Sequence, residues 1–303
     1  MTTIELVAKE YFNKEINEIS IRRCKTGDVN TSYIASCDSK KVFIKIQDKT
    51  NLPAFYSGQI EREVAGLEIC KNNGIQCPKI LLYDYKRKFI VTEYIEYPLL
   101  GQLWSSINTT QKLNIKQLAL GITRKMNSVM SHMFGAIFHS RGENFSNWGD
   151  CYYHLIKTAI DDCLFYKTLT KEDSYIILKV AQENTTFLYN DIAAHFCHMD
   201  FHWNNIFVRQ KDDTYEVAGV IDFGSSLFTP AYMDLFRLEG GFLYGTERFY
   251  ENGIRPYEID KHQLFCADLL NTIDYFVFLS FTHQSTGNLK IRLIDICKKY
   301  SCL

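Results

Sequence analysis

The most constraining feature of this chain is a pair of short motifs joined by two apolar runs. Residues 198–205 read His-Met-Asp-Phe-His-Trp-Asn-Asn, and residues 221–224 read Ile-Asp-Phe-Gly. Between them, two runs rich in β-branched residues flank a polar stretch, a pattern that predicts an antiparallel hairpin. The first residue of one strand of such a hairpin lies beside the last residue of the other, so we expect Asn205 and Asp222 to be neighbours.

The side chains at the ends of this hairpin suggest a chemistry. A carboxamide and a carboxylate side by side are hard oxygen ligands that suit Mg²⁺. Asp200 comes one short loop before Asn205, so it can face the same point and accept a proton from an incoming hydroxyl. The alternative is an ordinary surface hairpin with turn-forming Asp and Asn residues, but two motifs in this order argue against it. We expect Asp200 as the catalytic base and Asn205 and Asp222 as metal ligands.

A lysine lies inside an apolar strand predicted over residues 42–46. Lys45 should point to the opposite face from its apolar neighbours, where it needs a partner or a phosphate unless the strand forms a sheet edge. In a helix predicted over residues 58–73, Glu63 lies close to the apolar stripe, whereas Glu61 lies on the far side. We therefore expect Glu63, rather than Glu61, to orient Lys45 toward the phosphates of a nucleotide.

Two further segments of the first part of the chain are candidate nucleotide contacts. The turn at residues 26–30 contains Gly27 and Asn30, but a single glycine is a weak signal for a phosphate-binding loop. The strand predicted over residues 89–95 ends this part, and its backbone around Glu93 to Ile95 could bind a nucleotide base in a crevice between domains.

Beyond residue 97 the apolar spacing becomes helical. Apolar residues recur every three or four positions from Ile115 to Ile137, which predicts a long helix, with the methionines between 126 and 133 in the core. This change sets the expected domain boundary. Residues 1–96 should form a β-rich, nucleotide-binding N-lobe, and residues 97–303 a mainly helical C-lobe with the catalytic loop, the metal site and the substrate site.

Composition and charge narrow the class of protein. A chain of 303 residues that is 46% hydrophobic can bury a substantial core. No apolar stretch is long enough to span a bilayer and the start lacks a signal-peptide layout, so we expect a cytoplasmic protein that binds neither membrane nor nucleic acid. The ten cysteines are scattered without zinc spacing, which favours free thiols. We expect a monomer or a dimer.

The net charge of −1 is unevenly distributed along the chain. Residues 1–149 are basic and residues 150–303 are acidic. The basic part suits a polyphosphate ligand, and the acidic part would attract a cationic acceptor if its carboxylates line the binding site. Both imbalances could instead be spread over solvated surface.

Together these residues resemble a known family. The resemblance is to the aminoglycoside phosphotransferases and choline kinases, and it extends over about residues 20–280. It implies an α+β, protein-kinase-like bilobal fold, a nucleotide that is ATP or GTP with Mg²⁺, and phosphorylation of a hydroxyl group on a small molecule. The matching positions are Lys45, Glu63, residues 74–78, residues 91–94, His198, Asp200, Asn205, residues 221–224 and the pair Asp234-Leu235.

The resemblance also bears on details. It implies that Asp234 braces the catalytic loop. The segment 26–33 is similar to the nucleotide loop of fructosamine kinases, although that subfamily usually has Leu-Trp after the catalytic aspartate where this chain has Phe201-His202-Trp203. A protein kinase is disfavoured, because nine residues between Gly224 and Asp234 leave no room for an activation loop.

The acceptor stays open. His202 and Trp203 lie beside Asp200, and Trp203 either packs against the acceptor or belongs to the core. Carboxylates that could bind amino groups include Glu239, with others up to residue 251 and the pair at 161 and 162, unless they are solvated surface.

Several acceptor classes and one other function remain. An aminoglycoside, with a possible role in antibiotic resistance, is the first candidate. A ketosamine, a choline-like amine, or a sugar or amino-acid alcohol are alternatives. A non-catalytic nucleotide-binding module is disfavoured because it would be expected to lose at least one of the four central residues, and Lys45, Asp200, Asn205 and Asp222 are all present.

Overall fold

The chain divides into two compact units in the computed structural model, which describes residues 1–24, 29–137, 144–189, 193–234 and 260–300. Both units are made of segments that are distant in the sequence. The lobe boundary expected between residues 96 and 97 stays a prediction, because these units are defined by contacts alone. Unit 1 comprises Met1–Asn51, Gly58–Leu118 and Trp203–Ser225, and unit 2 comprises Leu52–Ser57, Ala119–His202 and Ser226–Leu303.

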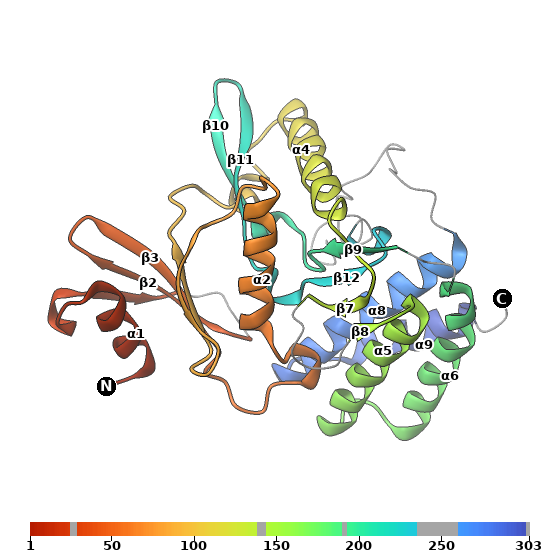
Figure 1. Ribbon diagram of the computed structural model, residues 1–303. Helices are drawn as coiled ribbons and strands as arrows, with labels where there is room; N and C mark the ends of the chain where they lie inside the picture. Colours follow the sequence, from red (N-terminus) through yellow and green to blue (C-terminus); the bar gives the residue numbers. More distant parts are fainter. Residues whose placement is uncertain (25–28, 138–143, 190–192, 235–259, 301–303) are drawn as a thin grey trace. The chain divides into compact units, whose positions relative to one another are not determined.

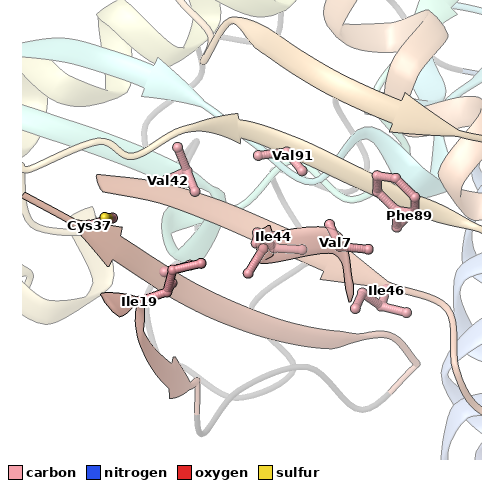
Figure 2. Packing of buried hydrophobic residues seen from close by; sticks show 10 residues of the cluster. Val7, Ile19, Cys37, Val42, Ile44, Ile46, Phe89 and Val91 are labelled. Atoms are coloured by element: carbon pink, nitrogen blue, oxygen red, sulfur yellow. The ribbon is translucent and has the colours of Figure 1, made fainter. Parts of the chain in front are cut away.

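Unit 1 contains a five-stranded antiparallel sheet in the order β1-β2-β3-β5-β4, of which β2 and β3 are labelled in Figure 1. Apolar side chains alternate along β3, and Val42, Ile44 and Ile46 belong to one buried cluster with Val7 of helix α1 (Figure 2). This alternation leaves Lys45 on the other face of the sheet. The elements are α1 (Thr3–Phe12), η1 (Ile16–Glu18), β1 (Ser20–Arg23), β2 (Thr31–Cys37), β3 (Lys40–Ile46), β4 (Ile80–Asp84) and β5 (Phe89–Glu93).

Helix α2 (Gln59–Asn72) follows a left-handed glycine, Gly58, whose φ is 73°. The predicted apolar stripe is buried, but so are several polar residues of the first two turns. Glu61, expected on the far side from that stripe, is only 8% exposed. A helix that is covered on one face buries a single stripe of residues. Helix α2 buries more than this stripe because it also packs against the short helix η4 (Phe223–Ser225).

The hairpin predicted between the two motifs is present in unit 1. Strands β10 (Ile206–Lys211) and β11 (Thr214–Val220) pair antiparallel with Ile206 opposite Val220, between the short helices η3 (Trp203–Asn205) and η4. The segment before helix α3 (Leu100–Leu103) lies along this hairpin, because the amide of Val208 donates to the carbonyl of Pro98 over 3.0 Å.

The helix predicted through Ile137 is shorter than expected. Helix α4 (Thr109–Asn127) ends where the Asn127 side chain donates to the carbonyl of Phe196 over 3.1 Å. Residues after it enter a second sheet, so their helical spacing is coincidental. The core prediction for the methionines holds only for Met126, because Met130 is 60% and Met133 39% exposed.

Unit 2 combines this second antiparallel sheet, in the order β6-β9-β12-β7-β8, with the long helices α5, α6, α8 and α9 among its described residues. The expectation that no apolar stretch is long enough to span a bilayer was wrong for helix α8 (Lys261–Phe281), which is long and apolar enough by length and composition. However, 67% of its apolar window is buried, as in the core helix of a globular unit. The elements are η2 (Ala54–Tyr56), β6 (Met130–Ser131), β7 (Phe134–Ala136), β8 (Asn144–Phe145), α5 (Trp148–Phe165), α6 (Lys171–Leu188), β9 (Ala194–Cys197), β12 (Leu227–Thr229), α8 (Lys261–Phe281) and α9 (Gly287–Tyr300).

The expectations for fold class and cysteines agree with this architecture. A β-rich N-terminal region and a helical C-terminal part confirm the predicted α+β class. Within the described part of the chain, nine cysteines are free thiols, and seven of them are buried. They serve as small apolar side chains, as their scattered positions predicted.

Candidate active site

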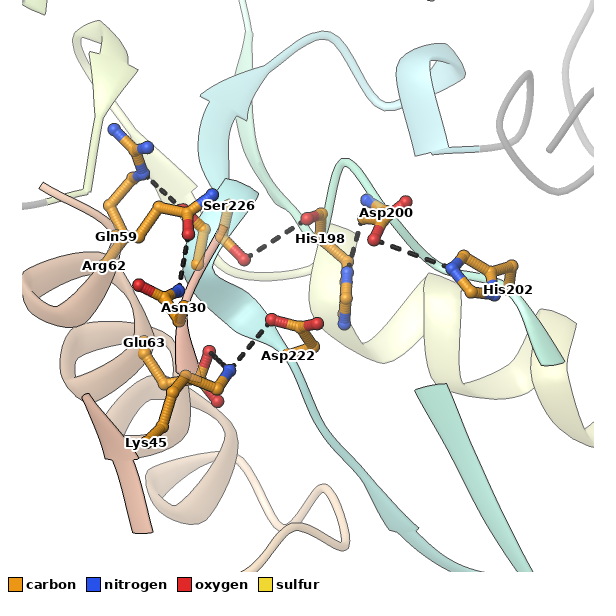
Figure 3. Close-up of polar contacts among 11 residues, drawn as sticks. Asn30, Lys45, Gln59, Arg62, Glu63, His198, Asp200, His202, Asp222 and Ser226 are labelled. Atoms are coloured by element: carbon orange, nitrogen blue, oxygen red, sulfur yellow. Dashed lines mark hydrogen bonds and ion pairs between the residues drawn. The ribbon is translucent and has the colours of Figure 1, made fainter. Parts of the chain in front are cut away.

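Lys45 of β3 lies between two carboxylates in unit 1 (Figure 3). Its Nζ is 3.0 Å from Oε2 of Glu63 and 2.9 Å from Oδ1 of Asp222, and its side chain is 9% exposed. Burial disfavours the charge of the ammonium, but the charges of Asp222 and Glu63 outweigh it and hold the pKa of Lys45 above its usual range. Lys45 is therefore a fixed cation. The expected pair with Glu63 is present, and Asp222 is a second partner that the sequence did not indicate.

Asp222 has an unusual backbone conformation. Its φ of 69° lies in the left-handed region, which aspartate tolerates better than most residues. Directly before it, the amide of Ile221 donates to the carbonyl of Asn205 over 3.0 Å, so the ends of the hairpin meet as predicted. The carboxylate of Asp222 and the carboxamide of Asn205 are oxygen donors of the kind that Mg²⁺ prefers, and half of the Asp222 side chain is accessible. The donor set fits the metal.

The expected nucleotide loop is described only in part. Gly27 lies outside the described residues. Asn30 is buried, and its Nδ2 donates to Oε1 of Gln59 on α2 over 2.6 Å. Its Oδ1 is buried without a hydrogen-bond partner among the residues that the structure describes. Asn30 is thus bound to the helix that carries Glu63.

The segment after β5 was expected to contact the nucleotide base. The amide of Glu93 donates to the carbonyl of Lys79 over 2.9 Å, and the two side chains form an ion pair at 3.2 Å. The Ile95 side chain covers Gly219 of β11 so closely that a Cβ there would lie 2.5 Å from its Cδ1. Glu93 therefore contacts the residue before β4, and Ile95 contacts the hairpin. The amide of Glu93 already donates a hydrogen bond to Lys79.

In unit 2, the loop that contains Asp200 is held by Asp234. The fully buried Asp234 carboxylate accepts hydrogen bonds from the amides of His198 and Met199, over 2.9 and 2.8 Å. Met199 has a left-handed φ of 63°, and the amide of Asp200 donates to Nδ1 of His198 over 3.3 Å. These contacts are the bracing that the family resemblance implied for Asp234.

The side chains that follow Asp200 have different surroundings. Nε2 of His202 lies 3.6 Å from Oδ2 of Asp200 (Figure 3), and both are partly exposed. In unit 1, Trp203 packs against Trp104, with ring centroids 4.7 Å apart. Trp104 was missed in the sequence, since it follows a helix of only four residues that has no recognisable period.

The acidic residues proposed for a cationic acceptor have other roles where the structure describes them. The carboxylate of Asp162 accepts hydrogen bonds from the backbone amides of Ala54 and Phe55, both over 2.9 Å, and so holds η2. Asp161 forms an ion pair with Lys157 at 2.6 Å. Residues 239–251, including Glu239, lie outside the described residues.

Two family models match the sequence, one at each end. Residues 1–116 match the model described as Fructosamine kinase, and residues 169–264 match the model described as Phosphotransferase enzyme family. Among curated proteins, none matches the chain. Both matched families are small-molecule kinases, which confirms the predicted resemblance and the predicted enzyme class, transfer of phosphate to a hydroxyl group.

Solved structures share the fold over the whole chain. A putative fructosamine-3-kinase from Thermobifida fusca YX-ER1 has 14% identity and a TM-score of 0.68, with 99% of each chain covered. One from Haemophilus somnus 129PT has 14% identity and a TM-score of 0.67, covering 98% of this chain and 96% of that one. The aminoglycoside phosphotransferase APH(4)-Ia, as a thermostable mutant with AMP-PNP and hygromycin B, has 12% identity, a TM-score of 0.66 and coverage of 99% and 98%. The protein-kinase-like fold is thereby confirmed.

Proposed function

We propose that this protein transfers the γ-phosphoryl group of ATP or GTP to a hydroxyl of a small molecule, directly and without a covalent intermediate. The observation that carries this proposal is the buried Lys45 ammonium, fixed between Glu63 and Asp222 at 3.0 and 2.9 Å. A cation held in this way suits the phosphates of a nucleotide. The solved relative with AMP-PNP and hygromycin B has the same fold and holds a nucleotide together with a small molecule.

Each candidate residue has a role in this reaction. Lys45 would bind the α- and β-phosphates, with Glu63 fixing its direction, and the loop around Gly27 and Asn30 would cover them. The backbone near Glu93 and Ile95 would bind the base. Asn205 and Asp222 would hold Mg²⁺, which when bound neutralises charge on the phosphates.

Asp200 would accept the proton of the acceptor hydroxyl as the new bond to phosphorus forms. Its loop is preorganised, because Asp234 binds the two preceding amides and thereby fixes the backbone that carries the carboxylate. His202 and Trp203, which follow it, would contact the acceptor, as would Glu239. Positioning and charge neutralisation then supply the catalysis.

Two acceptor classes have support from different observations. An aminoglycoside is supported by the phosphotransferase match over residues 169–264, which includes Asp200, Asn205 and Asp222. A ketosamine is supported at least as well, by the fructosamine kinase match over residues 1–116 and by two solved relatives. Free thiols at nine cysteines fit a reducing compartment, which supports a cytoplasmic location.

The test is Mg-dependent transfer of γ-phosphate from ATP and GTP to a panel of aminoglycosides, ketosamines, choline, ethanolamine and sugar alcohols. We expect turnover with one class, and its loss in Asp200→Asn. Turnover that persists in this variant would remove Asp200 from the role of base. Absence of any nucleotide binding would refute the proposed function.

A further inference from the structure

One face of helix α2 contacts every residue of the Asp222-Phe223-Gly224 segment, directly or through Lys45. Residues three, four and seven positions apart lie on the same side of a helix, and the four residues of this face follow that spacing. All belong to unit 1, and all are buried. They are Gln59, Arg62, Glu63 and Gly66.

The contacts of this face are short and specific. Nε of Arg62 donates to the carbonyl of Gly224 over 2.6 Å, in a buried environment (Figure 3). Gly66 lies so close to Phe223 that a Cβ there would be 2.5 Å from the Cβ of Phe223. Gln59 packs on Gly224, where an added Cβ would meet its Cβ at 3.4 Å.

This face matters because of the backbone of Asp222. A non-glycine residue in the left-handed region has a backbone strain that its surroundings must offset, and Asp222 has a φ of 69°. Before it, the Ile221 amide is bound to Asn205. After it, the Gly224 carbonyl is bound to Arg62, by a charge-assisted bond that is stronger than one between neutral groups.

We propose that Arg62 is a positioning residue for Asp222. By holding the Gly224 carbonyl, Arg62 keeps the exit of the Asp222 turn against α2, so that the carboxylate stays beside Lys45. The inference rests on the proposed function in one respect, namely that Asp222 holds the metal ion that accompanies the nucleotide. The placement of the turn itself is a property of the protein without ligand.

The first experiment measures this placement directly. Backbone amide exchange is followed by mass spectrometry in ligand-free wild type, Arg62→Met and Arg62→Lys, for peptides that contain Ile221 to Ser225. We expect exchange about tenfold faster in Arg62→Met, since a hydrogen bond to a charged donor is lost, and partial recovery in Arg62→Lys. Peptides from the tip of the β10–β11 hairpin should be unchanged. Equal exchange in wild type and Arg62→Met would overturn the inference.

The second experiment measures ATP affinity with Mg²⁺ and with EDTA by calorimetry. We expect Arg62→Met to weaken binding about tenfold with Mg²⁺ and little with EDTA, because Arg62 acts through Asp222. The matched control is Lys71→Met, which removes a positive charge from an exposed position of the same helix and should change neither value. Equal weakening in both conditions would indicate a merely structural role and overturn the inference. Failure of wild type to bind ATP would refute the proposed function, while the exchange result still decides the placement.

Discussion

The carboxylate of Asp222 has two proposed roles. It forms an ion pair with Lys45 at 2.9 Å, and we propose that it also holds the metal ion. Lys45, Glu63 and Asp222 together carry one net negative charge when all are ionised, so the group attracts a divalent cation more than a second ammonium.

The sequence predicted the pair of Lys45 with Glu63 and the meeting of Asn205 with Asp222, because helix spacing and strand pairing determine these positions. The sequence did not predict the Lys45–Asp222 and Arg62–Gly224 contacts, which join segments 177 and 162 residues apart.

At Asp222, replacement by alanine removes one metal ligand and one partner of Lys45. We expect Asp222→Ala to weaken Mg-ATP binding at least about tenfold, as loss of a charged partner does, with a smaller effect on binding in EDTA. Calorimetry with both conditions measures this. Asp213→Ala, at the exposed turn of the same hairpin, is the control. Normal Mg-ATP affinity in Asp222→Ala would disprove the ligand assignment.

At Asp200, replacement by asparagine keeps the shape of the side chain but removes its capacity to accept a proton. We expect turnover to fall by about 100-fold or more, with Mg-ATP affinity nearly unchanged, since general-base catalysis contributes on this order. A coupled kinase assay and calorimetry give the two values. Asp213→Asn serves as the matched control. Near-normal turnover would be incompatible with Asp200 as the base.

At the scale of elements, long periodic segments were predictable and short ones were not. The alternation in β3, the stripe of α2 and the β10–β11 hairpin follow from patterns of five or more residues. The sheet of unit 2 has strands of two to four residues, too few to show a period, and its first strand begins where a helix was predicted to continue. The packing of α2 on η4 had no sequence signal, apart from Gly66 within a helix.

The close approach of α2 and Phe223 predicts a contrast between two helix glycines. Gly66→Ala forces a shift, since the new Cβ would lie 2.5 Å from Phe223, and we expect a loss of about 1–3 kcal/mol in the free energy of unfolding. Gly121→Ala, in α4, meets nothing within 4 Å and should gain about 0.5–1 kcal/mol. Urea unfolding of both variants measures the difference. A stabilised Gly66→Ala protein would refute the tight contact.

At the scale of the whole molecule, the short segment Leu52–Ser57 is the least expected feature. It follows β3 and precedes α2, both in unit 1, yet it belongs to unit 2. There Asp162 binds its amides, and the Tyr56 hydroxyl donates to Asp274 Oδ1 over 2.9 Å. Six residues without periodicity give no sign of such an attachment in the sequence.

The Asp162 contact predicts a pH dependence of stability. Burial raises the pKa of the Asp162 carboxyl, and the two backbone donors oppose this rise without cancelling it. The folded chain then holds the proton to higher pH than the unfolded chain. The stabilisation that this carboxyl adds to the free energy of unfolding is complete below about pH 4. It is lost as the pH rises through the folded-state pKa.

Asp162→Asn does not titrate at this position, so the comparison isolates the carboxyl. We expect the free energy of unfolding of wild type, minus that of Asp162→Asn, to decrease as the pH rises above about 4. Urea unfolding at a series of pH values measures this difference. A difference that grows with pH would show that the backbone donors dominate the carboxyl instead.

The interleaving of the two units also bears on how such a gene can change. Unit 1 extends from Met1 to Ser225 and unit 2 from Leu52 to the end of the chain, so the two overlap over most of the sequence. No single break in the coding sequence leaves both units whole. A single crossover therefore cannot exchange one unit whole and leave the other intact.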